Sequence, residues 1–193
     1  MKRLLILLLL TCLPAVAVTN TAGKAGNWSD TTVWDQGHMP VAGEDVALAS
    51  YTVTWDAGAG TRIPATSGTL TSLTGGNGGS LTVAVNTIGS CSLNATTITG
   101  DSAGYAALVA VSGTTTNTFT VVGNVFGGTG TGSGVTIACG SCPLVITGNV
   151  TGSAQRGLTG QGNKTITVTG DITGGTNAVA LFLSNYTGAC TVN

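Results

Sequence analysis

Three copies of one short motif, Val122-Gly123-Asn124-Val125, Thr147-Gly148-Asn149-Val150 and Thr169-Gly170-Asp171-Ile172, decide the fold of this chain. A weaker fourth copy is Thr99-Gly100-Asp101, and the four glycines are 23, 25 and 22 residues apart. Repeats of this length, built from alternating apolar and Thr-rich stretches, are typical of solenoids in which one unit is stacked many times. The sequence therefore predicts a repeat architecture.

Apolar and polar residues alternate on both sides of each repeated glycine. Counted from the glycine, positions −4, −2 and +2 are apolar in all three copies. They are Phe119, Val121 and Val125, then Leu144, Ile146 and Val150, then Ile166, Val168 and Ile172. Such alternation is typical of a half-buried strand. The glycine falls on the inward side, and we interpret it as a bend between two faces of the coil.

The repeat units begin near Leu81, Leu108, Val135, Leu158 and Leu181, and each contains two strand-like runs. No window of ten residues after position 17 has helical periodicity, and glycine is too frequent for long helices. The predicted fold is an all-β, right-handed parallel β-helix with about 22 to 27 residues per coil and an N-terminal β cap. Residues 57–69 are expected to form a connecting loop, with one irregular coil within it as an alternative, and residues 75–79 a tight turn.

The N-terminus has the features of a secretory signal peptide. Lys2-Arg3 is a positive segment, and Leu4 to Leu10 is an apolar run shorter than the roughly 20 residues of a membrane-spanning helix. Ala15-Val16-Ala17 supplies small residues for cleavage after Ala17. An alternative is a lipoprotein signal that ends at Cys12. No later segment predicts a transmembrane helix, so we expect the mature protein to be secreted or held at the cell surface.

Charged residues make up 7% of the chain, far below the usual quarter. After residue 17, four basic and seven acidic residues remain, which gives a net charge near −3. A nucleic-acid partner is not expected, because it would require a basic face. Solubility must instead come from hydroxyl and amide groups, which is common in secreted β-solenoids.

The sequence divides into a signal peptide at 1–17, an N-terminal cap segment at 18–60 and β-helix coils at 61–193. The segment 18–60 holds all three tryptophans, the single histidine and five of the seven acids. Trp28 and Trp34, with a turn at Pro40, are suited to covering the open end of the first coil. The chain ends at Asn193 in the middle of a predicted strand. We expect either a longer protein, of which this is a part, or end-to-end pairing with another chain.

The cap segment carries a recognisable pattern of residues. Gly26-Asn27-Trp28-Ser29 and Trp34 are followed by Pro40-Val41-Ala42-Gly43-Glu44-Asp45-Val46 and by a short strand ending at Asp56. This stretch, Gly26 to Asp56, resembles the start of G8-type domains, with Glu44 as an additional residue before Asp45. The resemblance implies a β-rich N-terminal piece that leads into a parallel β-helix, and it implies no reaction.

The outward positions of the strands are the candidate binding residues. They are Thr97, Thr99, Thr118, Thr120, Asn124, Thr147, Asn149, Thr165, Thr167, Thr169 and Asp171. Their Thr-x-Thr pairs resemble the flat arrays with which some β-solenoid antifreeze proteins order water. Threonine is also a good strand residue on a solvated face. The sequence therefore leaves open ice binding, an adhesive or glycan-binding face, and plain solvation.

Acidic residues are few and scattered along the repeats. Asp101, Asn124, Asn149 and Asp171 are interpreted as a polar ladder that caps turns. Asp101 and Asp171 would lie about 14 Å apart in one column, too far for a pair of glycosidase carboxylates. In the cap, Asp45 and Asp56 are expected to accept hydrogen bonds from turn amides, with calcium between them as an alternative.

His38 is expected to be a surface loop residue. No cofactor and no metal site are predicted, and no catalytic cluster is visible in this sequence.

The four cysteines after the leader are Cys91, Cys139, Cys142 and Cys190. Cys139-Gly140-Ser141-Cys142 lacks the second ligand pair of a zinc site. Cys91, the Cys139/Cys142 pair and Cys190 belong to alternate coils, whose Cα atoms would lie about 10 Å apart, beyond the reach of a disulfide. The predicted disulfide is therefore Cys139–Cys142, in an oxidising compartment.

The predicted function is that of a secreted or cell-surface structural or adhesive protein, with glycans or cell-surface components as partners. Two alternatives stay open at this point. One is a polysaccharide-active lyase or hydrolase whose site lies outside this sequence, and the other is an ice-binding protein.

Overall fold

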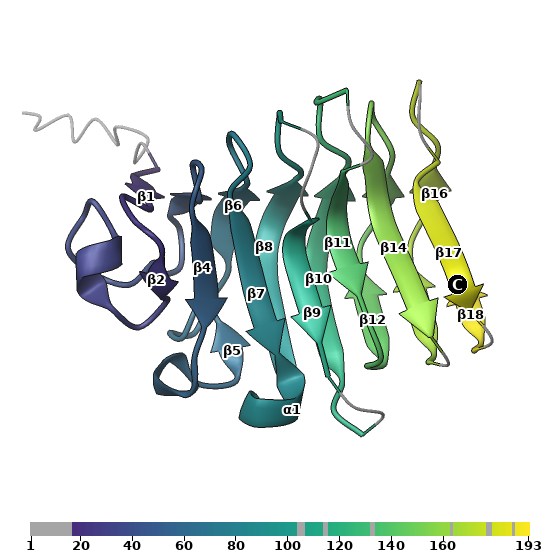
Figure 1. Cartoon of the computed structure of the whole chain (residues 1–193), viewed down its shortest axis with the longest axis horizontal. Helices are drawn as coiled ribbons and strands as arrows, with labels where there is room; N and C mark the ends of the chain where they lie inside the picture. The colour runs from purple at the N-terminus through teal and green to yellow at the C-terminus, as the bar shows by residue number, and fades with distance from the viewer. Residues whose placement is uncertain are drawn as a thin grey trace, which may run out of the picture.

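The computed structural model describes residues 17–103, 107–113, 116–131, 134–162, 164–176, 179–186 and 188–193. In this part of the chain, parallel strands are stacked coil upon coil as a β-helix solenoid (Figure 1). The predicted all-β class and the stacking of the repeats are thus confirmed. The predicted signal peptide and the alternative lipidation at Cys12 lie outside the described residues, apart from Ala17.

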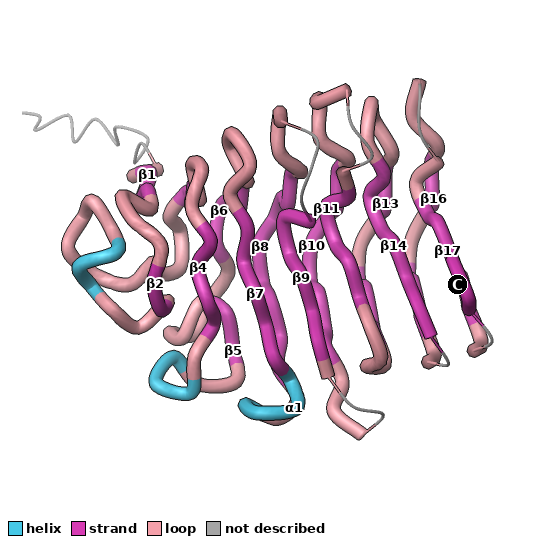
Figure 2. The backbone as a smooth tube through the Cα atoms, in the orientation of Figure 1, coloured by secondary structure: helices cyan, strands magenta, loops and turns pink. Residues whose placement is uncertain are grey.

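Two sheets run along the solenoid, and the chain alternates between them (Figure 2). The eleven-stranded sheet of the described residues contains β1 (Thr19–Thr21), β3 (Asp45–Ala47), β5 (Arg62–Ile63), β6 (Leu70–Thr74), β8 (Cys91–Thr99), β10 (Phe119–Phe126), β12 (Leu144–Thr147), β13 (Val150–Thr151), β15 (Ile166–Thr169), β16 (Ile172–Thr173) and β18 (Cys190–Val192). The seven-stranded sheet contains β2 (Gly26–Asn27), β4 (Thr52–Trp55), β7 (Ser80–Ala84), β9 (Ala107–Ser112), β11 (Val135–Cys139), β14 (Arg156–Gly162) and β17 (Leu181–Tyr186).

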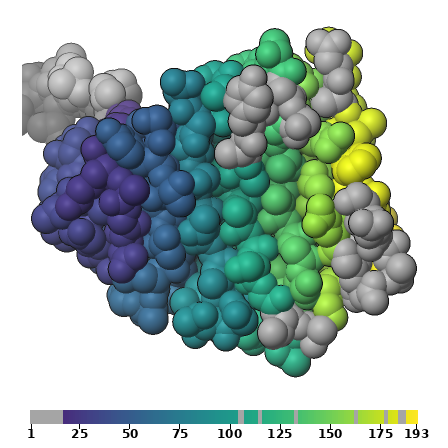
Figure 3. Space-filling model, viewed as in Figure 1, coloured from purple at the N-terminus to yellow at the C-terminus, as the bar shows by residue number. Residues whose placement is uncertain are grey.

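The described helices are single turns. They are η1 (Thr31–Val33), η2 (Ala57–Ala59) and α1 (Val85–Ile88). None of the described helices has the length and apolar character needed to cross a bilayer. In the space-filling view the coils follow one another as bands in sequence order (Figure 3).

Inward side chains of successive coils stack in columns that form the core. One column of the eleven-stranded sheet consists of Cys91, Phe119, Leu144, Ile166 and Cys190. The next inward column consists of Leu93, Val121, Ile146, Val168 and Val192. All but the two residues of the last strand are buried. Each fully buried side chain of this kind contributes about 1.5 to 3 kcal/mol to folding, so the alternation read from the sequence is what fixes the strands.

The repeated glycines lie at a bend in the eleven-stranded sheet. Gly123, Gly148 and Gly170 have φ angles of 143°, 142° and 138°, a region that side chains disfavour. A Cβ atom at Gly148 would lie 2.3 Å from the carbonyl oxygen of Gly123 in the preceding coil. The predicted bend is therefore present, but the obstacle to a side chain is the backbone of the neighbouring coil rather than the core.

The coils of the seven-stranded sheet do not begin where the sequence indicates. Leu81 pairs with Val109 rather than Leu108, and Val109 pairs with Ile137, two residues beyond Val135. Leu108 and Val109 are both fully buried, so the apolar pattern does not distinguish the two registers. The remaining predicted starts, Leu158 and Leu181, do pair with each other.

Residues 57–69 contain one short strand within the predicted connecting segment. Within them, β5 pairs with β8, where Arg62 lies beside Ser92 and Ile63 beside Leu93. Ile63 is fully buried, so this short strand extends an inward column by one coil. The turn at residues 75–79 is present between β6 and β7, closed by the Gly79 amide donating to the Gly75 carbonyl at 3.0 Å.

The N-terminal segment supplies the first strands of both sheets. β1 and β3 belong to the eleven-stranded sheet, and β2 and β4 belong to the seven-stranded sheet. Trp28 packs against Trp34 and Trp55, with ring centroids 4.8 and 5.1 Å away, and all three are buried. Their predicted action as a cap over the first coil, and the boundary at residue 60, stay predictions.

The bend predicts the effect of Gly148→Ala. A methyl group there would collide with a backbone carbonyl, and the native φ angle is one that alanine disfavours. We therefore expect the free energy of unfolding to fall by at least about 2 kcal/mol. Gly174→Ala is the matched control, because no atom lies within 4 Å of a Cβ there. The free energy of unfolding of this control, measured in urea, should change by less than about 0.5 kcal/mol. Equal effects of the two substitutions would contradict the packing at the bend.

Candidate functional site

The eleven predicted binding residues all lie on the outer face of the eleven-stranded sheet or in its turns. None of them is buried. The glycine bend divides them into two groups. Thr118, Thr120, Thr147, Thr165, Thr167 and Thr169 precede the bend, whereas Thr97, Thr99, Asn124, Asn149 and Asp171 follow it.

The predicted alignment of the threonine pairs is wrong for Thr97-x-Thr99. Thr97 lies beside Asn124, and Thr99 beside Phe126, so this pair does not stack on Thr118-x-Thr120. The reason is that Thr97 and Thr99 follow the bend, whereas Thr118 and Thr120 precede it. An irregularity in β8, where Ala95 and Thr96 lie opposite Gly123, sets Thr97 beside Asn124.

Apolar residues also interrupt the outward threonine columns. Thr120 and Thr167 are separated by Val145. Val122 and Phe126 are exposed on the outer face of β10. The flat threonine array that an ice-binding face requires is therefore broken in the described coils.

Amide side chains after the bend form a ladder between coils. The Asn149 backbone N–H donates to Asn124 Oδ1 at 3.0 Å, and the Asp171 N–H donates to Asn149 Oδ1 at 2.9 Å. These oxygens satisfy turn amides that strand pairing leaves unpaired. The ladder expected for Asn124, Asn149 and Asp171 is thus present, and the side-chain oxygens of Asn124 and Asn149 hold the coils together.

Asp101 does not belong to this ladder, contrary to the sequence prediction. Thr97 occupies the corresponding position beside Asn124, and its hydroxyl donates to the Thr71 carbonyl at 3.4 Å. Asp101 lies four residues further along the chain and is buried, where the Gln155 amide donates to it at 3.4 Å. The predicted separation of about 14 Å between Asp101 and Asp171 in one column therefore has no basis.

A hollow lined by hydroxyl groups lies at Thr118 and Thr120. It has a volume of about 200 Å³ and is lined by Thr61, Ser90, Cys91, Ser92, Thr118 and Thr120. The Thr118 backbone N–H donates to Ser90 Oγ at 3.0 Å, and Asn94 Nδ2 donates to Ser92 Oγ at 3.2 Å. Two of its hydroxyl groups are therefore already engaged by the protein.

The larger of the two hollows lies on the opposite sheet, where no binding residue is predicted from the sequence. This trough has a volume of about 420 Å³ on the seven-stranded sheet, and its outward residues are Thr82, Ala110, Ser112, Ala138, Gly140, Thr159 and Gln161. Thr82, Ala110, Ala138 and Thr159 form one column across four strands. The small side chains of Ala110 and Ala138 create this hollow, because the larger side chains of Thr82 and Thr159 flank them in the column.

The sequence does contain a pattern that predicts the trough, a run of small residues on neighbouring strands, but the wrong register hides this pairing. Coils that start at Leu108 and Val135 would place Ala110 beside Ile137. The observed pairing places Ala110 beside Ala138, so two small residues fall next to each other. A correct register would have revealed this run of small residues.

An aromatic side chain extends the trough column by one strand. Phe182 lies beside Thr159 in the register of β14 and β17, and its side chain is 37% exposed. The Arg156 guanidinium stacks on the Phe182 ring, 3.9 Å from its centroid. Such a cation–π contact holds the ring in one orientation. Next to it, Thr159 Oγ1 is covered and has no hydrogen-bond partner among the described residues.

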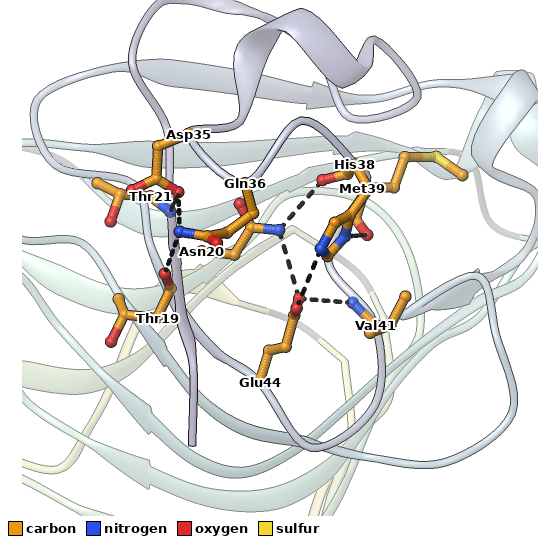
Figure 4. A network of polar contacts seen from close by, with 9 residues as sticks. All are labelled: Thr19, Asn20, Thr21, Asp35, Gln36, His38, Met39, Val41 and Glu44. Carbon is orange, nitrogen blue, oxygen red and sulfur yellow. Dashed lines mark hydrogen bonds and ion pairs between the residues drawn. The ribbon is translucent and has the colours of Figure 1, made fainter. Parts of the chain in front are cut away.

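A second polar cluster fastens the first strand to the N-terminal loop (Figure 4). Glu44 is 8% exposed, and its Oε2 accepts from the Val41 N–H at 2.9 Å and from Asn20 Nδ2 at 3.3 Å. His38 Nε2 lies 3.5 Å from Glu44 Oε1, and the His38 side chain is about half exposed. Asn20 also donates to the His38 carbonyl at 3.1 Å.

The importance of Glu44 could not be read from the sequence. There it is only an additional residue before Asp45. In the structure it is the acceptor at the centre of this cluster, and His38 is a loop residue tied to it.

The two acids considered for calcium belong to different sheets. Asp45 on β3 accepts from the Ser72 hydroxyl, whereas Asp56 after β4 accepts from the Ser29 amide and hydroxyl at 3.2 and 2.5 Å. The expectation of a turn amide is therefore met at Asp56, while Asp45 has a hydroxyl donor instead. Among the described residues, no group of three or more His, Cys, Asp or Glu side chains is arranged to hold a metal ion.

Scans of the chain against protein-family models, curated proteins and solved structures find no match. The resemblance of Gly26 to Asp56 to G8-type domains therefore stays a prediction, and the β-helix assignment rests on the geometry of the coils.

The Glu44 cluster predicts how the N-terminal end responds to substitution. Glu44→Leu keeps the volume but removes the acceptor of the part-buried Val41 N–H and one of the two acceptors of the buried Asn20 amide. We expect the free energy of unfolding in urea to fall by about 1 to 3 kcal/mol. His38→Ala is the control, since a half-exposed pair contributes about 0 to 1 kcal/mol. A larger loss in the His38 variant would show that the contact between His38 and Glu44, rather than the buried acceptor, holds this end.

Proposed function

We propose that this chain is a secreted or cell-surface protein of structural or adhesive kind, which binds carbohydrate on the outer surface of its solenoid. The leader at residues 1–17 supports export, with its positive start, short apolar run and small residues before the expected cleavage point. The low charge and the abundance of threonine and asparagine support a partner that is recognised by hydrogen bonds rather than by ion pairs.

The trough on the seven-stranded sheet is the observation on which the proposal depends. Binding sites for small ligands combine an apolar floor with a few polar groups that fix orientation. Ala110 and Ala138 provide a floor, and the hydroxyl group of Ser112 and the amide group of Gln161 lie beside it. A sugar ring presents the matching surface, because its C–H face is apolar and its edge carries hydroxyl groups.

The repeat of the strands supports a linear glycan as the ligand. Neighbouring coils are about 4.8 Å apart, so the outward side chains form rows with a regular spacing. A polymer of pyranose rings also presents hydroxyl groups at short, regular intervals. Phe182, one strand beyond the trough, offers an aromatic ring on which a further sugar can stack.

The Thr/Asn-rich outer face, to which the sequence first assigned binding, is the second place to test. There the hollow at Thr118 and Thr120 is about half the volume of the trough, and the ladder of Asn124 and Asn149 is engaged between coils. These observations favour the seven-stranded sheet as the binding face. For a polysaccharide-cleaving enzyme or an ice-binding protein, no observation in the described residues adds support.

A matched pair of substitutions tests the proposal. Ala138→Tyr fills the trough, and Thr167→Tyr adds the same ring to the outer face of β15 in the other sheet. We expect the full chain to bind a plant, microbial or animal polysaccharide on a glycan array and in affinity electrophoresis. Ala138→Tyr should weaken that binding at least about tenfold, while Thr167→Tyr leaves it unchanged.

Circular dichroism and the urea midpoint of both variants control for folding. A folded wild-type chain that binds no polysaccharide contradicts the proposal. If Thr167→Tyr abolishes binding and Ala138→Tyr does not, the ligand occupies the Thr/Asn-rich face and the placement in the trough is wrong.

A further inference from the structure

Two thiols meet where the chain passes from the seven-stranded to the eleven-stranded sheet. Cys139 is the last residue of β11, and Cys142 lies two residues before β12. Their Sγ atoms are 3.1 Å apart, and Cys139 Sγ is also 3.1 Å from the Cys142 carbonyl oxygen. Both residues are buried, with exposures of 3% and 0%. We propose that Cys139 and Cys142 form a disulfide that closes this corner of the coil.

The other two described cysteines are placed where neither reaches this pair. Cys91 and Cys190 occupy one inward column, with Phe119, Leu144 and Ile166 between them. Four strand spacings of about 4.8 Å separate Cys91 from Cys190. Two such spacings separate each of them from Leu144, which follows Cys142 by two residues, so both distances exceed the roughly 7 Å between Cα atoms that a disulfide allows. Oxidation of the monomer is therefore confined to the corner.

The packing around the corner fits a fixed bridge. A Cβ atom at Gly113 would lie 3.3 Å from the Cβ of Cys142 and would collide with Val85. The glycine therefore makes room for Cys142 beside the preceding coil. Cys139 and Gly140 also line the trough, so a bridge between Cys139 and Cys142 holds one border of that hollow in place.

The oxidant of the reaction is a low-molecular-weight disulfide, such as glutathione disulfide, or the disulfide of a thiol oxidoreductase. One of the two thiols attacks as the thiolate and forms a mixed disulfide, which releases one thiolate of the oxidant. The other thiol then loses its proton and attacks the protein sulfur of the mixed disulfide, which releases the second thiolate of the oxidant.

Overall, two protein thiols become one disulfide, and the oxidant takes up two electrons and two protons as two thiols. Because both sulfurs are covered in the folded chain, the bond forms before this corner has packed. Once packed, it is shielded from reductants.

The test maps free thiols after refolding in a defined redox buffer. The full chain is refolded from urea with reduced and oxidised glutathione, blocked with N-ethylmaleimide under denaturing conditions and digested. Chymotrypsin is needed, because no Lys or Arg lies between Arg62 and Arg156, and cleavage after Phe126 separates this corner from Cys91.

The expected peptide holds Cys139 and Cys142 with two hydrogens fewer and no maleimide, while Cys91 and Cys190 carry the label. Glutathione should reduce the bridge at least about tenfold more slowly in the native protein than in urea. In the refolded protein, Cys139→Ser with Cys142→Ser should lower the urea midpoint under oxidising conditions, and Cys190→Ser should leave it unchanged. The proposal is overturned if Cys139 and Cys142 both carry the label at every glutathione ratio. It is also overturned if either is joined to Cys91, to Cys190 or to a second chain.

Discussion

The close approach of one coil's backbone to the next is the constraint on which the rest of the structure depends. Parallel strands exchange hydrogen bonds only if each coil lies directly on its neighbour, at about 4.8 Å. At the bend of the eleven-stranded sheet this brings a carbonyl oxygen against the following α-carbon, as Gly123 lies against Gly148. Glycine is required there because no side chain fits between the coils, and its recurrence in the sequence is a consequence of the stacking.

The same stacking explains the composition. A residue type that recurs at one position of the coil lies directly beside its own copies, and like charges at that spacing repel each other. Amide side chains gain instead, because Asn124 and Asn149 each accept a backbone N–H from the next coil. On the inner side apolar residues stack on one another, as Val121, Ile146 and Val168 do. The scarcity of charge in the repeats is therefore a consequence of the fold as well as a property of the surface.

The sequence predicted the elements that repeat and failed at those that do not. The columns that contain Phe119, Leu144 and Ile166 follow directly from the alternation around each glycine. The register of β9 could not be read, because Leu108 and Val109 are both apolar and both buried. For that reason the trough beside Ala110 and Ala138 was missed, and binding was assigned to the more regular threonine face. Glu44 and Asp101 were misjudged because burial of a single acid leaves no pattern in a sequence.

The division between regular and irregular positions bears on function. A side chain that recurs from coil to coil can be engaged by the neighbouring coil. Asn124 and Asn149 each accept a backbone N–H of the next coil, so less of their hydrogen-bonding capacity remains for a ligand. A ligand instead needs a place where a column changes size. Thr82, Ala110, Ala138 and Thr159 form such a column, since two methyl groups lie between two larger side chains. In a solenoid of this kind we therefore expect the binding surface where the side-chain size changes along a column. The regular coils provide the rigid support beneath it.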